Sequence, residues 1–215
     1  MYRFDVITIF PEMLNSVLNA SILQRAQKSK KIGVRFHNPR DKSTDKHKTV
    51  DDTPYGGGPG MVMKIMPLAR TIKAIRKRKK HRIILLSAKG ARFNQKKAQE
   101  LSQKYNHLIF VCGRYEGVDE RIKYYIDEEI SIGDFVLTGG ELGSAVIIDA
   151  VSRLVPGVLG HTESNQDESH STPGYLEYPH YTRPEVFDGH TVPKILLSGN
   201  HPEIAEWRKK QSKKT

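Results

Sequence analysis

Hydrophobic and polar positions along this chain predict strands and helices in turn. Residues 2–10 alternate and are rich in β-forming side chains, and Pro11 then opens a helical spacing of apolar residues that continues to Leu23. A second strand is expected at 34–37. Beyond it, the pattern predicts helices at 66–79, 94–104 and 142–154 and strands at 83–86, 108–111 and 129–132.

This order predicts an α/β fold with a mainly parallel sheet that helices cover on both faces. Ligands bind to such sheets beyond the carboxyl ends of the strands. Three loops that contain glycine fall at those ends, at 87–90, 112–117 and 132–140. Because glycine lets the backbone approach a ligand closely, these loops form the predicted ligand site.

The character of the chain changes after 155–157, where an almost wholly polar stretch follows at 161–172. Such a stretch is typical of a linker or a mobile loop. Pro and Gly then recur until a terminal helix begins near Pro202. We therefore expect a domain at 1–160, a flexible linker at 161–173 and a small, mostly helical domain at 174–215.

The charge distribution adds a partner to this picture. The formal net charge is +11, and the basic residues gather in two segments. Segment 70–104 has 13 Lys and Arg against Glu100 alone, and segment 25–48 has nine against two acidic residues. A localised surplus of this kind favours a polyanionic partner such as RNA, with a solvated lysine-rich helix face as the alternative.

The lone Cys112 excludes an internal disulfide framework and a cysteine zinc site, and it fits a reducing compartment. The N-terminus carries Arg3 and Asp5 and reads as a strand rather than a signal peptide. No uncharged run approaches the roughly 20 residues that cross a bilayer. We therefore expect a cytoplasmic protein.

The glycine-rich motifs are the candidate binding elements. PYGGGPGMVM at 54–63 has a backbone that packs against a flat or anionic ligand, or forms a tight turn. A nucleotide triphosphatase loop is disfavoured because Lys64 follows Met63 rather than a glycine. SIGDFVLTGGE at 131–141 suits an adenine ring bound by main-chain hydrogen bonds, or ordinary packing between a strand and a helix.

CGRYEGVDER at 112–121 places Arg114 and Glu116 where a ligand would lie, although these two could simply form a surface ion pair. Cys112 is expected to be a small buried residue rather than a nucleophile. Arg153 is an unexpected charge at the end of an apolar helix, and it either caps a carboxyl terminus or faces a site.

Two acidic residues of the polar stretch, Asp167 and Glu168, become interesting only with a substrate that must lose a proton. The histidines lack the spacing of metal ligands, and no metal site is predicted. Those considered are His161, His170, His180, His190 and His201.

Five motifs in one order resemble the TrmD family of tRNA (guanine-N(1))-methyltransferases and span nearly the whole chain: PYGGGPGMVM, CGRYEGVDER, SIGDFVLTGGE, DAVSRLVPGVLG and PHYTRPEV. The resemblance implies a SPOUT-type α/β fold with a trefoil knot through the cofactor loops, and a small helical C-terminal domain that binds tRNA. It also implies a homodimer with active sites between the subunits.

The implied reaction moves a methyl group from S-adenosylmethionine to N(1) of guanosine 37 of tRNA, next to the anticodon, which supports maintenance of the reading frame. A role for Mg²⁺ stays open. Arg153 matches the family's catalytic arginine. The positions that match cofactor loops are Ser87, Gly90, Gly113, Glu116, Gly117, Ile132, Gly133, Asp134, Phe135, Val136, Leu137, Gly139 and Gly140.

This chain departs from the family pattern in three places. Ala88 stands where relatives often have Pro, and the C-terminal part is shorter than usual, so an RNA contact there is expected to be missing or supplied otherwise. In place of the family's Asp-Ser pair the chain reads Asp167-Glu168-Ser169. Alignment on Ser169 makes Glu168 the general base, which we favour narrowly, and residue identity makes it Asp167.

Two other functions are compatible with the same features. One is a different SPOUT-class methyltransferase that acts on ribosomal RNA or on a ribose hydroxyl, which would not need the carboxylate at 167–168 in the same role. The other is a non-enzymatic RNA-binding protein with this fold, which would have no affinity for S-adenosylmethionine.

Overall fold

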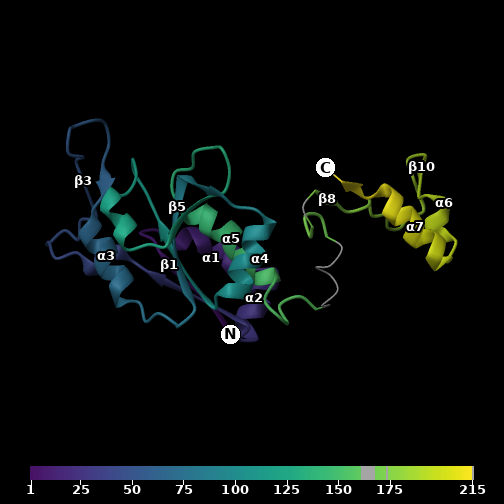
Figure 1. Ribbon diagram of the computed structural model, residues 1–215, viewed down its shortest axis with the longest axis horizontal. Helices are drawn as coiled ribbons and strands as arrows, with labels where there is room; N and C mark the ends of the chain where they lie inside the picture. The colour runs from purple at the N-terminus through teal and green to yellow at the C-terminus, as the bar shows by residue number, and fades with distance from the viewer. Residues whose placement is uncertain (161–167, 173, 215) are drawn as a thin grey trace. The chain divides into compact units, whose positions relative to one another are not determined.

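The computed structural model of the chain describes residues 1–160, 168–172 and 174–214. They belong to two compact units, Met1–Gly160 and His161–Thr215 (Figure 1). The expected linker at 161–173 lies largely outside the described residues.

The first unit is built on a five-stranded parallel sheet in the order β2-β1-β6-β5-β7. Its strands are β1 (Tyr2–Ile7), β2 (Ile32–His37), β5 (His81–Arg92), β6 (His107–Cys112) and β7 (Glu128–Ser131). A small hairpin of β3 (Asp51–Asp52) and β4 (Val62–Met63) stands apart from this sheet. The prediction of a mainly parallel sheet is confirmed.

Helices cover both faces of the sheet (Figure 1). One face carries α1 (Glu12–Leu18), α2 (Ser21–Lys28), α4 (Gln95–Lys104) and α5 (Glu141–Arg153). The other carries α3 (Ile65–Ala74) and the 3₁₀ helix η2 (Glu120–Tyr124), and a second 3₁₀ helix, η1 (Pro39–Lys42), contacts α3. Alternate residues of each strand point to opposite faces, so the sheet has a hydrophobic core on each side.

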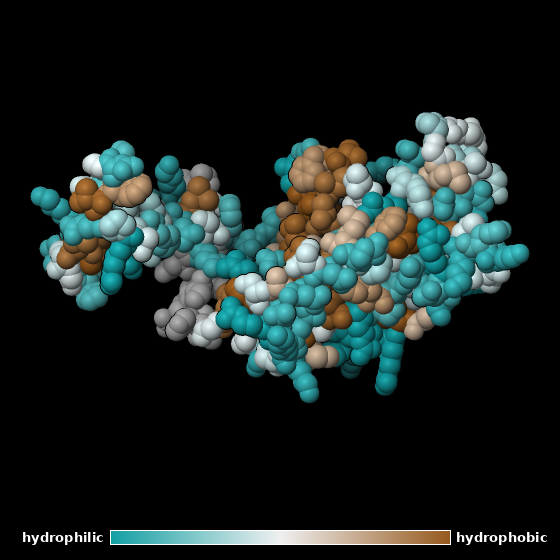
Figure 2. All heavy atoms as spheres, turned by 180° about the vertical axis from the view of Figure 1, so that it is seen from behind, coloured by the Kyte–Doolittle hydropathy of each residue, from teal (hydrophilic) through white to brown (hydrophobic). Residues whose placement is uncertain are grey.

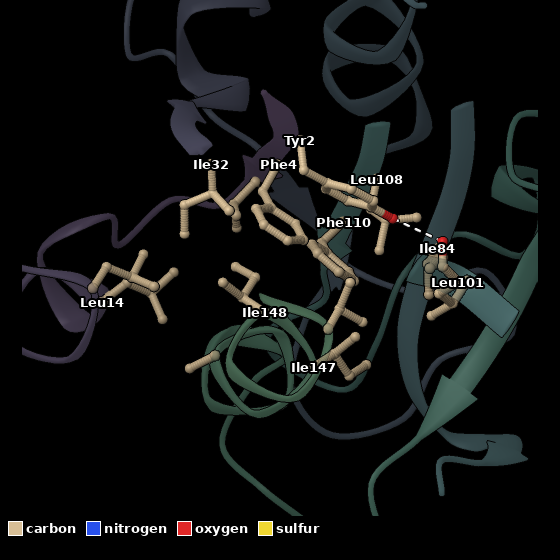
Figure 3. Close-up of a cluster of buried hydrophobic side chains, with 14 of the residues drawn as sticks. Tyr2, Phe4, Leu14, Ile32, Ile84, Leu101, Leu108, Phe110, Ile147 and Ile148 are labelled. Carbon is tan, nitrogen blue, oxygen red and sulfur yellow. Dashed lines mark hydrogen bonds between the residues drawn. The ribbon is translucent and has the colours of Figure 1, made fainter. Parts of the chain in front are cut away.

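Figure 3 shows the core on the α5 side, where Phe4 and Phe110 stack with ring centroids 6.4 Å apart. Ile147 and Ile148 of α5 pack in the same cluster. The Tyr2 hydroxyl donates a hydrogen bond of 2.9 Å to the Leu101 carbonyl, which satisfies its polar end inside the core. This packing fixes α5 against the strands whose ends form the loops described below.

Two predicted helices have different bounds in the structure. The helical pattern that starts at Pro11 is divided into α1 and α2, because the chain is extended at Ala20. The helix expected at 66–79 ends at Ala74, and Ile75 turns into the core in an extended conformation. The run of Lys and Arg that follows would place like charges on neighbouring turns of a longer helix, which destabilises it.

The second unit contains α6 (Lys194–Leu197), α7 (His201–Gln211) and four short strands, β8 (Tyr175–Leu176), β9 (Val186–Phe187), β10 (His190–Thr191) and β11 (Lys213–Lys214). None of its described side chains is buried. Aromatic contacts hold it: the ring centroids of Tyr181 and Trp207 are 6.4 Å apart, and the Arg208 guanidinium lies 4.9 Å from the Tyr178 ring. Asn200 caps α7 by accepting from the Glu203 N–H.

A buried ionic cluster lies on the α3 face, around the fully buried carboxylate of Asp5. The ring Nε2 of His37 lies 2.6 Å from its Oδ1, Arg3 donates to the same oxygen at 3.0 Å, and the buried His107 bonds to Oδ2. Although burial works to raise its pKa, the bonds from His107, His37 and Arg3 hold the pKa of Asp5 well below its usual value.

We expect Asp5→Asn to lower the free energy of unfolding by about 3 kcal/mol at pH 7, since it removes one partner from a buried cluster. The pKa of this carboxyl group is lower in the folded protein than in the unfolded chain, where it is about 3.9. The ionised carboxylate therefore stabilises the fold at pH values above about 3.9, and this stabilisation is lost as the pH falls toward the pKa of the folded protein. The difference between wild type and variant should therefore shrink in urea unfolding between pH 5 and about pH 3. A constant difference would contradict the role of the ionised carboxylate.

Candidate functional site

A cavity of about 280 Å³ opens at the carboxyl ends of β5, β6 and β7. These strands are neighbours in the sheet, so the loops that leave them meet at one edge. Residues of all three segments singled out from the sequence line the cavity, but the prediction of a loop at 87–90 is wrong, because these residues belong to β5, which continues to Arg92 past a register shift against β7. The predicted cofactor residues that line the cavity are Ser87, Gly113, Glu116, Gly117, Ile132, Gly133, Phe135, Val136, Leu137, Gly139 and Gly140.

Two residues of the predicted cofactor set do not line the cavity. Gly90 lies within β5 where the strand passes β7, and a Cβ there would be 2.5 Å from the backbone nitrogen of Ile130. Asp134 is exposed and forms an ion pair with Arg92. Gly90 is therefore needed for the close approach of two strands, and Asp134 stabilises the outside of its loop.

Close backbone packing explains the pair of glycines that ends the third loop. A Cβ at Gly140 would lie 2.8 Å from the Cα of Cys112 and 2.9 Å from the Cβ of Leu86. The Gly140 N–H donates to the Gly113 carbonyl at 3.0 Å, which joins the third loop to the second. The loop can return from the edge strand β7 across β5 to the end of β6 only because no side chain stands there.

The motif at 54–63 lies beside the second loop. The Glu116 N–H donates to the Met61 carbonyl at 3.0 Å, and the Met63 N–H donates to the Gly117 carbonyl at 2.9 Å. A Cβ at Gly60 would lie 2.6 Å from the side chain of Glu116. Gly60 therefore lets this motif pack directly against a carboxylate that faces the cavity, whereas a Cβ at Gly56, Gly57 or Gly58 would meet nothing within 4 Å.

The structure contradicts the alternative in which Arg114 pairs with Glu116. Arg114 instead donates from Nε to Oε2 of Glu141 at 3.0 Å. Glu141 is fully buried and also accepts a bond of 2.6 Å from the hydroxyl of Thr8. Sequence analysis missed Glu141 and Thr8, although an acidic residue at the start of an apolar helix was a signal for the first of them.

Cys112 is buried at the end of β6. Burial, together with the nearby charge of Glu141, raises the pKa of its thiol above its ordinary value. A thiol that resists ionisation is a poor nucleophile, in agreement with the expectation that Cys112 is a small core residue.

Arg153, one of the predicted catalytic residues, does not line this cavity in its own chain. Arg153 is the last residue of α5, ten residues after Gly143, which lines the cavity in the first turn of the same helix. At 1.5 Å per residue, the two are separated by about 15 Å along the helix axis. Glu168 belongs to the second unit, and Asp167 lies outside the described residues.

Among the residues described, no group of three or more His, Cys, Asp and Glu could hold a metal ion. The helices of the described part of the chain are all too short or too polar to cross a bilayer.

Comparison with known proteins adds independent information on the site. A family model described as tRNA (guanine-1)-methyltransferase TrmD matches residues 2–215. Similar curated proteins are named tRNA (guanine-N(1)-)-methyltransferase. That of Carboxydothermus hydrogenoformans is 57% identical over 98% of this chain and 82% of its own length. That of Dictyoglomus turgidum is 55% identical over 100% of this chain and 86% of its own length, and that of Geobacter sp. strain M21 is 54% identical over 99% and 85%.

Proposed function

Because this chain belongs to the TrmD family of tRNA (guanine-N(1))-methyltransferases, we propose that its cavity binds S-adenosylmethionine and that the methyl group passes to N(1) of guanosine 37 in tRNA. The observation that carries the proposal is the meeting of two glycine-containing loops, which follow β6 and β7, with residues 85–89 of the adjacent strand β5. One of these loops contributes apolar side chains and backbone amides, and the other contributes a carboxylate.

Different residues of the cavity lining suit different parts of S-adenosylmethionine. Ile132, Phe135 and Val136 offer apolar surface to an adenine ring, and the backbone of the same loop offers donors and acceptors to its edge. The Glu116 carboxylate, held against Gly60, supplies negative charge toward a cationic ligand. These positions are consistent with the cofactor residues predicted from the sequence.

Methylation of guanine N(1) requires the loss of its proton. As the bond from N(1) to the methyl carbon forms and the sulfur–methyl bond breaks, that proton passes to a base and negative charge grows on O6. We propose that Glu168, or Asp167 next to it, accepts the proton and that Arg153 stabilises the charge on O6. The products are N(1)-methylguanosine and S-adenosylhomocysteine.

The distance of Arg153 from the cavity in its own chain supports an active site shared by two subunits. The positions of α5 that face away from the core are Leu142, Val146, Asp149 and the half-buried Arg153, which fall on one stripe of the helix. If this stripe meets the same stripe of a second copy in antiparallel fashion, a two-fold axis brings Arg153 toward the partner's α5 N-terminus. The partner's cavity lies at that end of the helix.

Exposed hydrophobic surface supports the same homodimer. Leu142 and Val146 are 45% and 47% exposed, and Val17 of the neighbouring helix α1 is 42% exposed. Figure 2 shows hydrophobic side chains, coloured brown, gathered among hydrophilic ones, coloured teal, on one face of the larger unit. Single subunits rarely leave such a surface in contact with water, and a second copy would cover it.

The basic segments support binding of tRNA by the first unit. Arg70 of α3 donates to the Lys42 carbonyl of η1 at 3.3 Å, so the two segments meet. Exposed cations around this contact include Lys46, Lys73 and Arg76. They offer positive charge to a phosphate backbone. With tRNA as the proposed substrate, the reaction would take place in the cytoplasm. The return of the third loop across β5, described above, is compatible with the trefoil knot of the SPOUT class.

The test is transfer of labelled methyl groups to tRNA transcripts that carry either guanosine or adenosine at position 37. We expect activity with guanosine only, and N(1)-methylguanosine in nuclease digests. Activity with both transcripts would overturn the proposed position. Methylation of ribose or of ribosomal RNA alone would favour another SPOUT-class enzyme, and a lack of affinity for S-adenosylmethionine in calorimetry would favour a non-enzymatic RNA-binding protein.

A further inference from the structure

We propose that Arg114 is a positioning residue for the methyl donor: anchored on Glu141, it holds the loop at 132–140 in the conformation that binds the donor. The inference rests on the proposed function in one respect, which is that the cavity binds S-adenosylmethionine. It adds a residue and a mechanism that neither the family resemblance nor the sequence assigned.

The anchor is a buried carboxylate with two partners far apart in the sequence. Glu141 is fully buried in the first turn of α5, where the helix dipole stabilises a negative charge. Its Oε1 accepts from the Thr8 hydroxyl at 2.6 Å, and Thr8 in turn accepts from the Phe10 N–H at 2.9 Å. This ties the start of α5 to the end of β1.

Arg114 connects this anchor to the cavity loop. Its Nε donates to Oε2 of Glu141 at 3.0 Å, and its Nη1 donates to the Thr138 carbonyl at 3.2 Å. Only 12% of its side chain is exposed, and Arg114 and Thr138 both line the cavity. The loop that carries most of the predicted cofactor contacts is therefore held by the Arg114 guanidinium, which is itself fixed by the buried carboxylate of Glu141.

The arrangement requires the shape of an arginine side chain. The guanidinium carbon lies 4.7 Å from the Phe10 ring centroid, and Nη2 contacts the sulfur of Met13. The planar group therefore fits between apolar side chains of the α1 region and two acceptors on its edge. A lysine has the charge but not the rigid fork, and it cannot reach the carboxylate and the carbonyl together.

Gly139 fits the same account. A Cβ at this position would overlap the Arg114 side chain and approach Oε2 of Glu141 to 2.6 Å. The glycine pair therefore allows the loop to pass directly over the ion pair as well as over the ends of the strands. The position of the loop and the position of Arg114 depend on each other.

The experiment compares Arg114→Gln, Arg114→Lys and Glu141→Gln with wild type in calorimetric titration with S-adenosylhomocysteine and S-adenosylmethionine. We expect Arg114→Gln to weaken binding by about tenfold or more, with Arg114→Lys in between, since a charge-assisted contact to the loop is lost. In methyl transfer, KM for the donor should rise by a similar factor while kcat stays within about threefold of wild type.

Arg82→Gln is the matched control. Arg82 pairs with Glu128 at 2.9 Å, a distance close to that of the Arg114 pair, but neither residue lines the cavity. We expect this variant to lose thermal stability and to keep donor affinity within about twofold of wild type.

Donor affinity unchanged in folded Arg114→Gln, or weakened equally in Arg82→Gln, would show a purely structural role and overturn the inference. If Arg114→Gln does not fold, Arg114→Lys and the isosteric Glu141→Gln decide in the same assay. Failure of the wild type to bind either compound would count against the proposed function instead.

Discussion

Replacement of Arg153 by Gln is expected to lower the single-turnover rate of methyl transfer by about 10²–10³-fold, the effect of removing one donor from a developing oxyanion. The measurement uses saturating tRNA and S-adenosylmethionine, so that the rate reports the chemical step. Affinity for the donor should stay unchanged, because the proposed contact of Arg153 is with O6 of the guanine, which is absent until tRNA binds, and Arg153 does not line the cavity of its own chain. Arg153→Lys should recover part of the rate by retaining the charge.

The proposed sharing of the active site between two subunits gives a second test of this variant. Gly140→Leu fills the space between the ends of β5 and β6 and should abolish donor binding in its own subunit. Neither variant should be active alone. A mixed dimer would combine the intact cavity of the Arg153→Gln subunit with the Arg153 of the other, so subunits exchanged in equal amounts should regain about a quarter of wild-type sites. No regain after confirmed exchange would mean that the arginine acts within its own chain or not at all.

The sheet could be predicted because its strands are short, apolar and separated by helical patterns. β6 is buried along its whole length, and the exposed positions of α5 repeat at helical spacing. The loops that follow β6 and β7 could be predicted by the same reasoning, since the carboxyl ends of parallel strands lie at one edge of a sheet, whereas β5 continues through the loop expected at 87–90. This is why most of the residues predicted to bind S-adenosylmethionine line one cavity.

Features that depend on tertiary contacts could not be predicted. Glu141 is 133 residues from Thr8 and 27 from Arg114, and no rule of spacing relates them. Gly90 looked like a loop glycine, but its role is set by β7, which arrives almost 40 residues later. The division of the first helix at Ala20 has no Gly or Pro to mark it. At Glu141 and Gly90, a partner that is distant in the sequence decides the local structure.

The proposed base is the second residue with a large expected effect, and we expect Glu168→Gln to lower the rate of transfer by about 10²–10⁴-fold. The turn that carries it is held in place: the Ser171 N–H donates to the Glu168 carbonyl at 3.0 Å, and the Ser169 hydroxyl accepts from the Glu177 N–H at 3.0 Å. In the alignment that we favour, Ser169 matches the family's serine, and Glu168 then takes the position of the base. Asp167→Asn is the paired variant and should stay within a few-fold of wild type.

The pH dependence separates loss of a base from loss of a contact. Without an enzymatic base, only guanine that has already lost its N(1) proton can react, so the residual rate of Glu168→Gln should climb about tenfold per pH unit through the neutral range. Wild type should depend on pH far less steeply there. If instead Asp167→Asn shows the deep loss and the steep rise, the base is the aspartate and the alignment slips by one residue. If neither variant loses more than a few-fold, the proton leaves by another route, and a ribose or ribosomal target becomes the better account of the carboxylates at 167–168.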